Sequence, residues 1–208
     1  MKYIYYLSLG ANLGDRLATI GKAVEALGQQ GEIIRVSQMY ETPPWGKLDQ
    51  PAFINCAVVI VSKLVPVEFL HGCQRIEKNL GRVRHEHWGA RTIDVDILCV
   101  QSINELESGR QAIEALLDSS ELACPLLMMD TEELQLPHPY MLERAFVMVP
   151  LAEIAPQLVL ANGKRAMEIC HSLPDKENIV SLVTNSCRLK RKYLYAVGPQ
   201  MRNKARCN

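Results

Sequence analysis

The chain is predicted to fold as an α+β domain with a ferredoxin-like βαββαβ arrangement, a mainly antiparallel sheet with helices packed on it. Segments rich in β-branched and aromatic residues are separated by two segments whose apolar residues recur every three or four positions. The order of these segments is strand, helix, strand, strand, helix, strand. That order is the split βαβ arrangement, and it places two helices on one face of the sheet.

Each element has its own local signal. The first helix is expected to be capped by Asp15 and to close at Gly28, and the second has Pro66 in its first turn and stops at Gly81. Strands are expected where Val, Ile and aromatic residues concentrate, at residues 3–10, 33–40, 53–62 and 92–100.

Composition describes an ordinary globular chain. Its 208 residues are 48% hydrophobic and 22% charged, enough for one domain with a proper core. The formal net charge is zero, so no global field attracts nucleic acid or membrane. No apolar run reaches the ~18 residues of a membrane span. Seven cysteines without a CxxC pair indicate reduced thiols, so we expect a cytoplasmic protein.

Charge is unevenly distributed beyond the fourth strand. Residues 101–133 contain eight acidic residues and one basic residue, and they include an AIEALL segment that predicts a short helix. A proline-stiffened loop is expected at residues 134–141, and residues 144–154 are expected to cap the core. We therefore expect one domain over residues 1–171 with an acidic insert at 101–133, followed by a basic tail at 172–208.

Asp94 and Asp96 are the strongest candidates for a functional site. Residues two apart in a strand point the same way, so both carboxylates share one face while the apolar residues beside them share the other. At ~6 Å and an effective dielectric of ~20, two bare carboxylates repel by roughly 3 kcal/mol, from which a purely structural strand gains nothing. Magnesium prefers such hard oxygen ligands. The pair therefore indicates a metal site, and a solvated strand face is the alternative.

The residues before this pair suit a bound polyphosphate. Arg82, Arg84 and Arg91 carry forked donors that match phosphate oxygens, although each alone would read as surface charge. Trp88, in the same charged segment, is expected to cover a flat ligand rather than to fill the core. No GxxxxGK[ST] motif occurs, so this is not a P-loop. The segment predicts a nucleotide–metal site of another kind.

Further motifs follow one another in a fixed order, together spanning about residues 3–160. They are LSLGANLGDR (7–16), YETPPWG (40–46), DQPAFIN (49–55), the arginine–aspartate segment (82–97), LPHP (136–139) and RAFVMVPLAEIAP (144–156). In this combination the sequence closely resembles the 6-hydroxymethyl-7,8-dihydropterin pyrophosphokinase family of folate biosynthesis. The resemblance implies transfer of pyrophosphate from ATP to the pterin hydroxymethyl oxygen, giving the pterin diphosphate and AMP.

The resemblance also implies a role for each matching residue. Asp94 and Asp96 would hold two Mg²⁺ ions that bridge the protein and ATP, and Arg82 and Arg91 would contact the polyphosphate as catalytic residues. Nucleotide contacts are expected from Gln74, Glu77, Arg84, Trp88, Ile97, His138 and Arg144. The pterin pocket is expected from Thr42, Pro43, Trp45, Phe53, Asn55 and Phe146.

The chemistry of the pterin residues is consistent with that role. A flat heteroaromatic ring stacks on aromatic faces such as Phe53 and Phe146. Asn55 both donates and accepts hydrogen bonds, which suits the amide edge of a pterin. Two features depart from the family pattern: Pro139 stands where some members have a tyrosine near the nucleotide, and the acidic segment is longer than the usual connection.

The expected partners are ATP and the pterin, with no nucleic acid and no membrane, and we expect a monomer. One alternative is an RNA-binding module of the same topology, which would need a [KR]-G-[FY]-[GA]-F pattern that is absent. Another is a catalytically silent member that only binds ligand. The intact aspartates and arginines argue against it.

Overall fold

The computed structural model describes residues 1–82, 89–104, 109–119 and 124–182. Its central sheet runs in the order β5-β1-β4-β3-β8, with β2 also paired to β4, and each of these pairings is antiparallel. The sheet strands are β1 (Lys2–Ala11), β2 (Glu32–Val36), β3 (Met39–Thr42), β4 (Phe53–Ser62), β5 (Asp94–Ile103) and β8 (Val180–Leu182). A separate hairpin pairs β6 (Met129–Asp130) with β7 (Gln135–Leu136).

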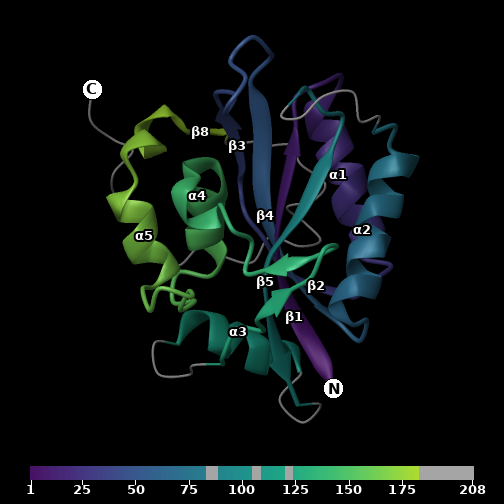
Figure 1. Ribbon diagram of the computed structural model, residues 1–208, viewed down its shortest axis with the longest axis vertical. Helices are drawn as coiled ribbons and strands as arrows, with labels where there is room; N and C mark the ends of the chain where they lie inside the picture. The colour runs from purple at the N-terminus through teal and green to yellow at the C-terminus, as the bar shows by residue number, and fades with distance from the viewer. Residues whose placement is uncertain (83–88, 105–108, 120–123, 183–208) are drawn as a thin grey trace.

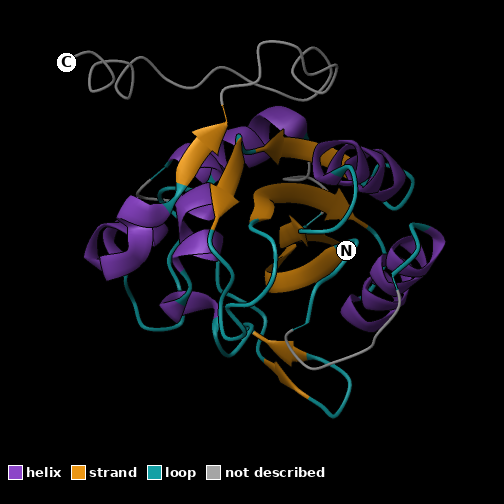
Figure 2. Ribbon diagram, turned by 90° about the horizontal axis from the view of Figure 1, so that it is seen from above, coloured by secondary structure: helices purple, strands orange, loops and turns teal. Residues whose placement is uncertain are grey.

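Helices cover both faces of the sheet. They are α1 (Arg16–Leu27), α2 (Pro66–Asn79), α3 (Arg110–Asp118), α4 (Ala145–Ile154) and α5 (Ala166–Ser172), with 3-10 turns η2 (Met141–Glu143) and η3 (Pro174–Asn178). Figure 1 shows α1 and α2 on one side of the sheet and α4 and α5 on the other, and Figure 2 shows the same layers from above. The predicted α+β fold is therefore confirmed, and the second helical layer comes from residues beyond the βαββαβ unit.

Strand β4 explains the two layers. Its sequence, FINCAVVIVS, is an almost continuous apolar run, and it is buried on both faces. Cys56 and Val58 belong to the hydrophobic cluster under α1 and α2, whereas Ala57 and Val59 belong to the cluster under α4 and α5. Because side chains alternate along a strand, one central strand supplies both cores.

The predicted helix boundaries are confirmed. The Asp15 carboxylate accepts a hydrogen bond from the Ala18 amide at 3.1 Å and caps α1, which ends just before Gly28. Pro66 occupies the first turn of α2. Gly81 follows that helix with φ of +85°, a left-handed conformation that glycine adopts without strain.

Some predicted strand and loop boundaries are wrong. The single strand expected at residues 33–40 is divided into β2 and β3. The division lies at Ser37, whose hydroxyl accepts from the Ala57 amide and donates to the Gln38 carbonyl. The fourth strand begins at Asp94 and continues to Ile103, beyond its expected end, and the loop expected at 134–141 contains β7.

The acidic insert is docked on the body of the protein where the structure describes it. The helix expected at AIEALL is α3. Arg110 of this helix donates to the Ile33 and Ile34 carbonyls at 3.1 and 3.0 Å, and Arg35 pairs with Asp118 at 2.7 Å. These contacts attach α3 to β2.

The range expected to form a tail contains part of the sheet. Residues 180–182 form β8, which pairs with β3. The folded unit therefore reaches at least Leu182, and residues 183–208 lie outside the described residues.

The outer edge of β5 is covered by other segments. The Val95 amide donates to the Glu77 carboxylate at 2.8 Å. Further along, the His138 amide donates to the Leu98 carbonyl and the Leu127 amide to the Val100 carbonyl, each at 2.7 Å. These bonds satisfy an edge that would otherwise be open to pairing with another chain.

Cys56, Cys73 and Cys99 are buried in the apolar layers, and burial raises the pKa of the Cys56 and Cys73 thiols to about 12. At pH 8 the thiolate fraction of such a group is about 10⁻⁴, and the thiolate is the reactive form. We expect iodoacetamide to leave these three cysteines unmodified in the folded protein and to modify them in urea. Peptide mass spectrometry would measure this, and native labelling of Cys56 at the rate of a free thiol would contradict it.

Candidate functional site

A cleft with about 600 Å³ of empty space, its open mouth included, lies where β1, β4 and β5 meet the start of α4. Its volume is within the range of small-molecule sites, about 300–1,000 Å³. Its lining residues come from four strands, two loops and the beginning of a helix. They are Ser8, Gly10, Thr42, Pro43, Trp45, Phe53, Asn55, Gly89, Arg91, Asp94, Asp96, Arg144 and Phe146.

The floor of the cleft is made by small residues of β1. Gly10 pairs with Asn55 on one side and with Asp94 on the other, and Ser8 pairs with Asp96. Adjacent strands are ~4.8 Å apart, so Asn55 and Asp94 lie ~10 Å apart across a glycine. A Cβ atom at Gly10 would lie only 2.6 Å from the Asn55 Oδ1 atom. The open floor therefore depends on glycine at this position.

Sequence reasoning did not identify Ser8 or Gly10 as site residues. The available signal was two small residues within the LSLGANLGDR motif, inside an otherwise apolar strand.

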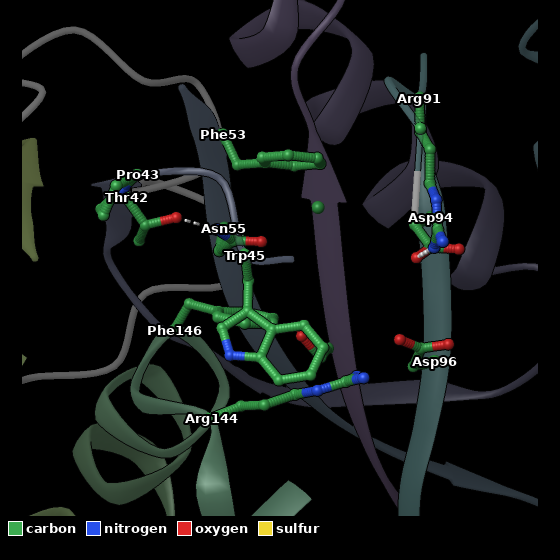
Figure 3. Close-up of a pocket in the computed structure, with 13 residues that line it drawn as sticks. Thr42, Pro43, Trp45, Phe53, Asn55, Arg91, Asp94, Asp96, Arg144 and Phe146 are labelled. Atoms are coloured by element: carbon green, nitrogen blue, oxygen red, sulfur yellow. Dashed lines mark hydrogen bonds and ion pairs between the residues drawn. The ribbon is translucent and has the colours of Figure 1, made fainter. Parts of the chain in front are cut away.

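One wall of the cleft is aromatic and amide-bearing. All six residues predicted for the pterin pocket line it, from Thr42 at the end of β3 to Phe146 in the first turn of α4. Figure 3 shows Phe53 and Phe146 on either side of the Asn55 side chain. The buried Asn55 amide donates one hydrogen bond to the Thr42 hydroxyl at 2.7 Å. Its carbonyl oxygen and second N–H are then available to a ligand.

The opposite wall is acidic and comes from β5. As predicted, Asp94 and Asp96 point into the cleft while Val95 packs in the core under α1 and α2 (Figure 3). Asp94 is already paired: Arg82 contacts its Oδ1 atom at 2.6 Å, and Arg91 contacts Oδ2. Within the described residues, Asp96 makes no hydrogen bond or ion pair. The two aspartates therefore differ: arginines neutralise Asp94, whereas Asp96 has no such partner in the part of the chain that the structure describes.

Glu77 supports this wall from behind. It is 5% exposed, and its carboxylate accepts from the Val95 amide and pairs with Arg82. Burial raises the pKa of Glu77, and the Arg82 charge opposes that rise. Neither Glu77 nor Arg82 lines the cleft. Arg82 pairs with both Glu77 and Asp94, so Glu77 holds Arg82 against Asp94.

Arg144, which directly precedes α4, faces Asp96 (Figure 3). Its guanidinium carbon lies 4.7 Å from the ring centre of Trp45, 5.2 Å from that of Tyr140 and 5.7 Å from that of Phe146. Burial lowers the pKa of Arg144, and the Asp96 charge counteracts this. Three aromatic faces thus hold a cation at the mouth of the cleft.

The remaining predicted nucleotide residues are more dispersed. Gln74 is exposed on α2, and Ile97 is buried in the core on the far face of β5. His138 is half-buried beside that strand, and burial lowers its pKa. None of the three lines the cleft, and Arg84 and Trp88 lie outside the described residues. Their nucleotide contacts stay predictions.

The donor set of the acidic wall fits magnesium brought in by a polyphosphate. Within the described residues, no three His, Cys, Asp or Glu side chains cluster to hold a metal ion alone. Magnesium, however, is usually bound by one or two carboxylates together with substrate phosphates and water. Asp94 and Asp96 supply the carboxylates, and the adjoining arginines would attract the phosphates.

Comparison with known proteins gives consistent matches. A family model described as 7,8-dihydro-6-hydroxymethylpterin-pyrophosphokinase (HPPK) matches residues 6–156. A 2-amino-4-hydroxy-6-hydroxymethyldihydropteridine pyrophosphokinase of Methylorubrum extorquens is 42% identical over 157 residues, covering 74% of this chain and 84% of that protein. The protein of the same name from Bacillus subtilis is 40% identical over 160 residues, covering 76% and 81%.

Solved structures share the fold. A crystal structure of an HPPK-DHPS in complex with substrates has a TM-score of 0.59 at 16% identity and is matched over 87% of this chain. A Plasmodium falciparum HPPK-DHPS triple mutant has a TM-score of 0.56 at 17% identity, over 86% of this chain. This chain spans 46% of each of those longer chains.

Proposed function

Because the chain belongs to the 7,8-dihydro-6-hydroxymethylpterin-pyrophosphokinase family, we propose that its cleft binds the pterin against β4 and the ATP phosphates against β5. The protein is an ATP-dependent pyrophosphokinase of folate biosynthesis. It transfers pyrophosphate from ATP to 6-hydroxymethyl-7,8-dihydropterin and releases AMP. The proposal rests on the cross-strand pairing of Gly10 with Asn55 on one side and with Asp94 on the other. This pairing places the amide-bearing wall and the acidic wall on opposite sides of one open floor.

The pterin occupies the aromatic wall. Phe53 and Phe146 offer faces for a flat ring, and Trp45 adds a third. Asn55 meets the amide edge of the pterin, and its bond to Thr42 holds it in place for that contact. This orientation directs the hydroxymethyl group towards β5.

Asp94 and Asp96 would hold two Mg²⁺ ions on the opposite wall. When bound, Mg²⁺ neutralises phosphate charge and aligns the triphosphate with the attacking hydroxyl. The Asp96 carboxylate is available for this without breaking any contact among the described residues. Asp94 must first exchange its arginine partners.

The arginines have a natural new partner in the polyphosphate. Arg82 and Arg91 are held by Asp94, at the edge of the space where phosphates would enter. Phosphate oxygens accept forked hydrogen bonds at least as well as a carboxylate does. We propose that both arginines pass to the phosphates and stabilise the charge that develops between the α- and β-phosphates. Positioning and electrostatics then account for catalysis, since the described lining of the cleft offers no histidine, and no carboxylate other than Asp94 and Asp96, as a general base.

The RNA-binding alternative has no support from the sheet. An RNA-recognition module stacks bases on aromatic side chains of an open sheet face. Here helices pack on both faces, and the strand tyrosines Tyr5 and Tyr6 are 0% and 1% exposed.

The proposed partners are the two small-molecule substrates. Among the described residues, none of the helices has the length and apolar character needed to cross a membrane. ATP and a small pterin are metabolites of the cytoplasm, which supports the expected location. One chain supplies every contact proposed here, which supports a monomer as the working unit.

Incubating the protein with ATP, Mg²⁺ and 6-hydroxymethyl-7,8-dihydropterin tests the activity. We expect AMP and the pterin diphosphate in equal amounts, separated by ion-exchange chromatography. Formation of ADP would instead mean single-phosphoryl transfer, and the absence of any product would favour a member that only binds its ligands. Omission of the pterin is the control for simple ATP hydrolysis.

A further inference from the structure

The motif LSLGANLGDR contains a buried amide that lies outside the cleft lining. Asn12 follows directly after β1 and is 3% exposed. Its Nδ2 atom donates to the Gln50 Oε1 atom and to the Pro51 carbonyl, each at 3.1 Å. Its Oδ1 atom accepts from the Arg91 amide at 2.7 Å. Both N–H groups and the carbonyl of this amide are thus engaged.

These partners belong to opposite walls of the cleft. Gln50 and Pro51 lie in the loop that leads into Phe53, on the aromatic wall proposed to bind the pterin (the pterin wall). Arg91 lines the cleft and precedes Asp94 on the acidic wall proposed to bind the ATP phosphates (the phosphate wall). The main-chain N–H of Asn12 also donates to the Arg91 carbonyl at 3.0 Å. Two hydrogen bonds therefore attach Asn12 to the phosphate wall.

Arg16, from the same motif, provides an informative contrast. Its Nη1 atom donates to the Glu41 carboxylate at 2.9 Å and to the Ala52 carbonyl at 2.7 Å. Glu41 precedes Thr42 and Ala52 precedes Phe53, so both contacts are on the pterin wall. Arg16 therefore attaches to one wall, whereas Asn12 joins the two.

We propose that Asn12 is a positioning residue that sets the separation of the pterin from the polyphosphate. It touches no reacting atom and acts through the loop before Phe53 and through the Arg91 main chain. An in-line transfer requires the hydroxyl within reach of the phosphorus, and a misplacement of ~1 Å lowers rates by about a hundredfold. This inference rests on the proposed function and identifies the residue that couples its two half-sites.

Three alanine variants separate this role from a merely structural one. Asn12→Ala releases both walls, Arg16→Ala releases the pterin wall alone, and Ser37→Ala removes a comparably buried side chain that bridges β4 to the segment between β2 and β3, away from the cleft. We expect Asn12→Ala to raise the pterin KM about tenfold and to lower kcat about a hundredfold. Arg16→Ala should raise the pterin KM but keep kcat within about threefold. Ser37→Ala should lower Tm without changing either constant.

Asn12→Asp provides a second test if the alanine variant does not fold. It preserves the side-chain volume and the acceptor for the Arg91 amide but removes both donors to the pterin-wall loop. Its kinetic constants should therefore resemble those of Arg16→Ala. Wild-type AMP formation is established first, so that a failure of the activity itself is distinguished from a failure of this inference. The inference is overturned if Asn12→Ala lowers Tm yet keeps wild-type constants, or if it alters only the pterin KM.

Discussion

Replacing Asp96 by asparagine is expected to lower kcat by about 10³-fold, equivalent to ~4 kcal/mol in the activation barrier. The substitution keeps the size of the side chain but removes the negative charge that would hold Mg²⁺. Because Asp96 has no hydrogen bond or ion pair within the described residues, we expect Tm to change by no more than a few degrees. Steady-state AMP formation and a thermal melt measure the two effects.

Asp94→Asn is the matched comparison. It should lower kcat to a similar extent but also destabilise the protein, since Arg82 and Arg91 would lose their shared counter-ion. Removing one partner from a mostly buried ion pair costs about 3 kcal/mol, and the side chains of Arg82 and Asp94 are only 12% and 15% exposed. Activity of either variant within about tenfold of wild type, ~1.4 kcal/mol, would contradict the proposed metal role.

Replacing Asn55 by leucine is expected to lower kcat/KM for the pterin by about 10²- to 10³-fold, ~3–4 kcal/mol. Asn55 is 4% exposed and lines the cleft, and its side-chain carbonyl and second N–H have no partner among the described residues. A leucine would bury the pterin amide edge without partners. Isothermal titration should find the affinity for an ATP analogue unchanged, because Asn55 lies on the wall opposite the phosphates.

Gly10→Ala provides a graded version of the same test. The added methyl group would lie 2.6 Å from the Asn55 carbonyl oxygen, so it displaces the amide without removing it. We expect a smaller rise in the pterin KM than Asn55→Leu gives. If Asn55→Leu binds the pterin as wild type does, the amide does not recognise the ligand and another residue must.

The sequence predicts the framework of this fold well because its signals are local. Asp15, Pro66 and Gly81 act through their own backbone and side chain, and each lies at the predicted helix end. The break between β2 and β3 was missed because it depends on a hydrogen bond that the amide of the distant Ala57 donates to the Ser37 hydroxyl. Helices on the second face have local signals, but their place on the sheet is set by long-range packing.

The residues of the candidate site also fall into those that local sequence signals identify and those that they do not. Asp94 and Asp96 stand out from charge and strand periodicity, and their orientation into the cleft follows from alternation. The contribution of Gly10 depends on register with two partner strands, and that of Asn12 depends on loops far away in the sequence. Neither side chain has a distinctive chemistry of its own. A sequence motif therefore shows that these residues are present but does not predict what they contact.

The register of β1 also ties the two half-sites to each other. Gly10 is hydrogen-bonded in register with Asn55 and Asp94 at once. A slip by one residue would turn Leu9 into the space between the substrates and bury Gly10 in the core. Neither half-site can therefore reach its native geometry while β1 is unpaired. The pterin half-site and the phosphate half-site therefore depend on the same strand register and would be lost together if β1 were displaced.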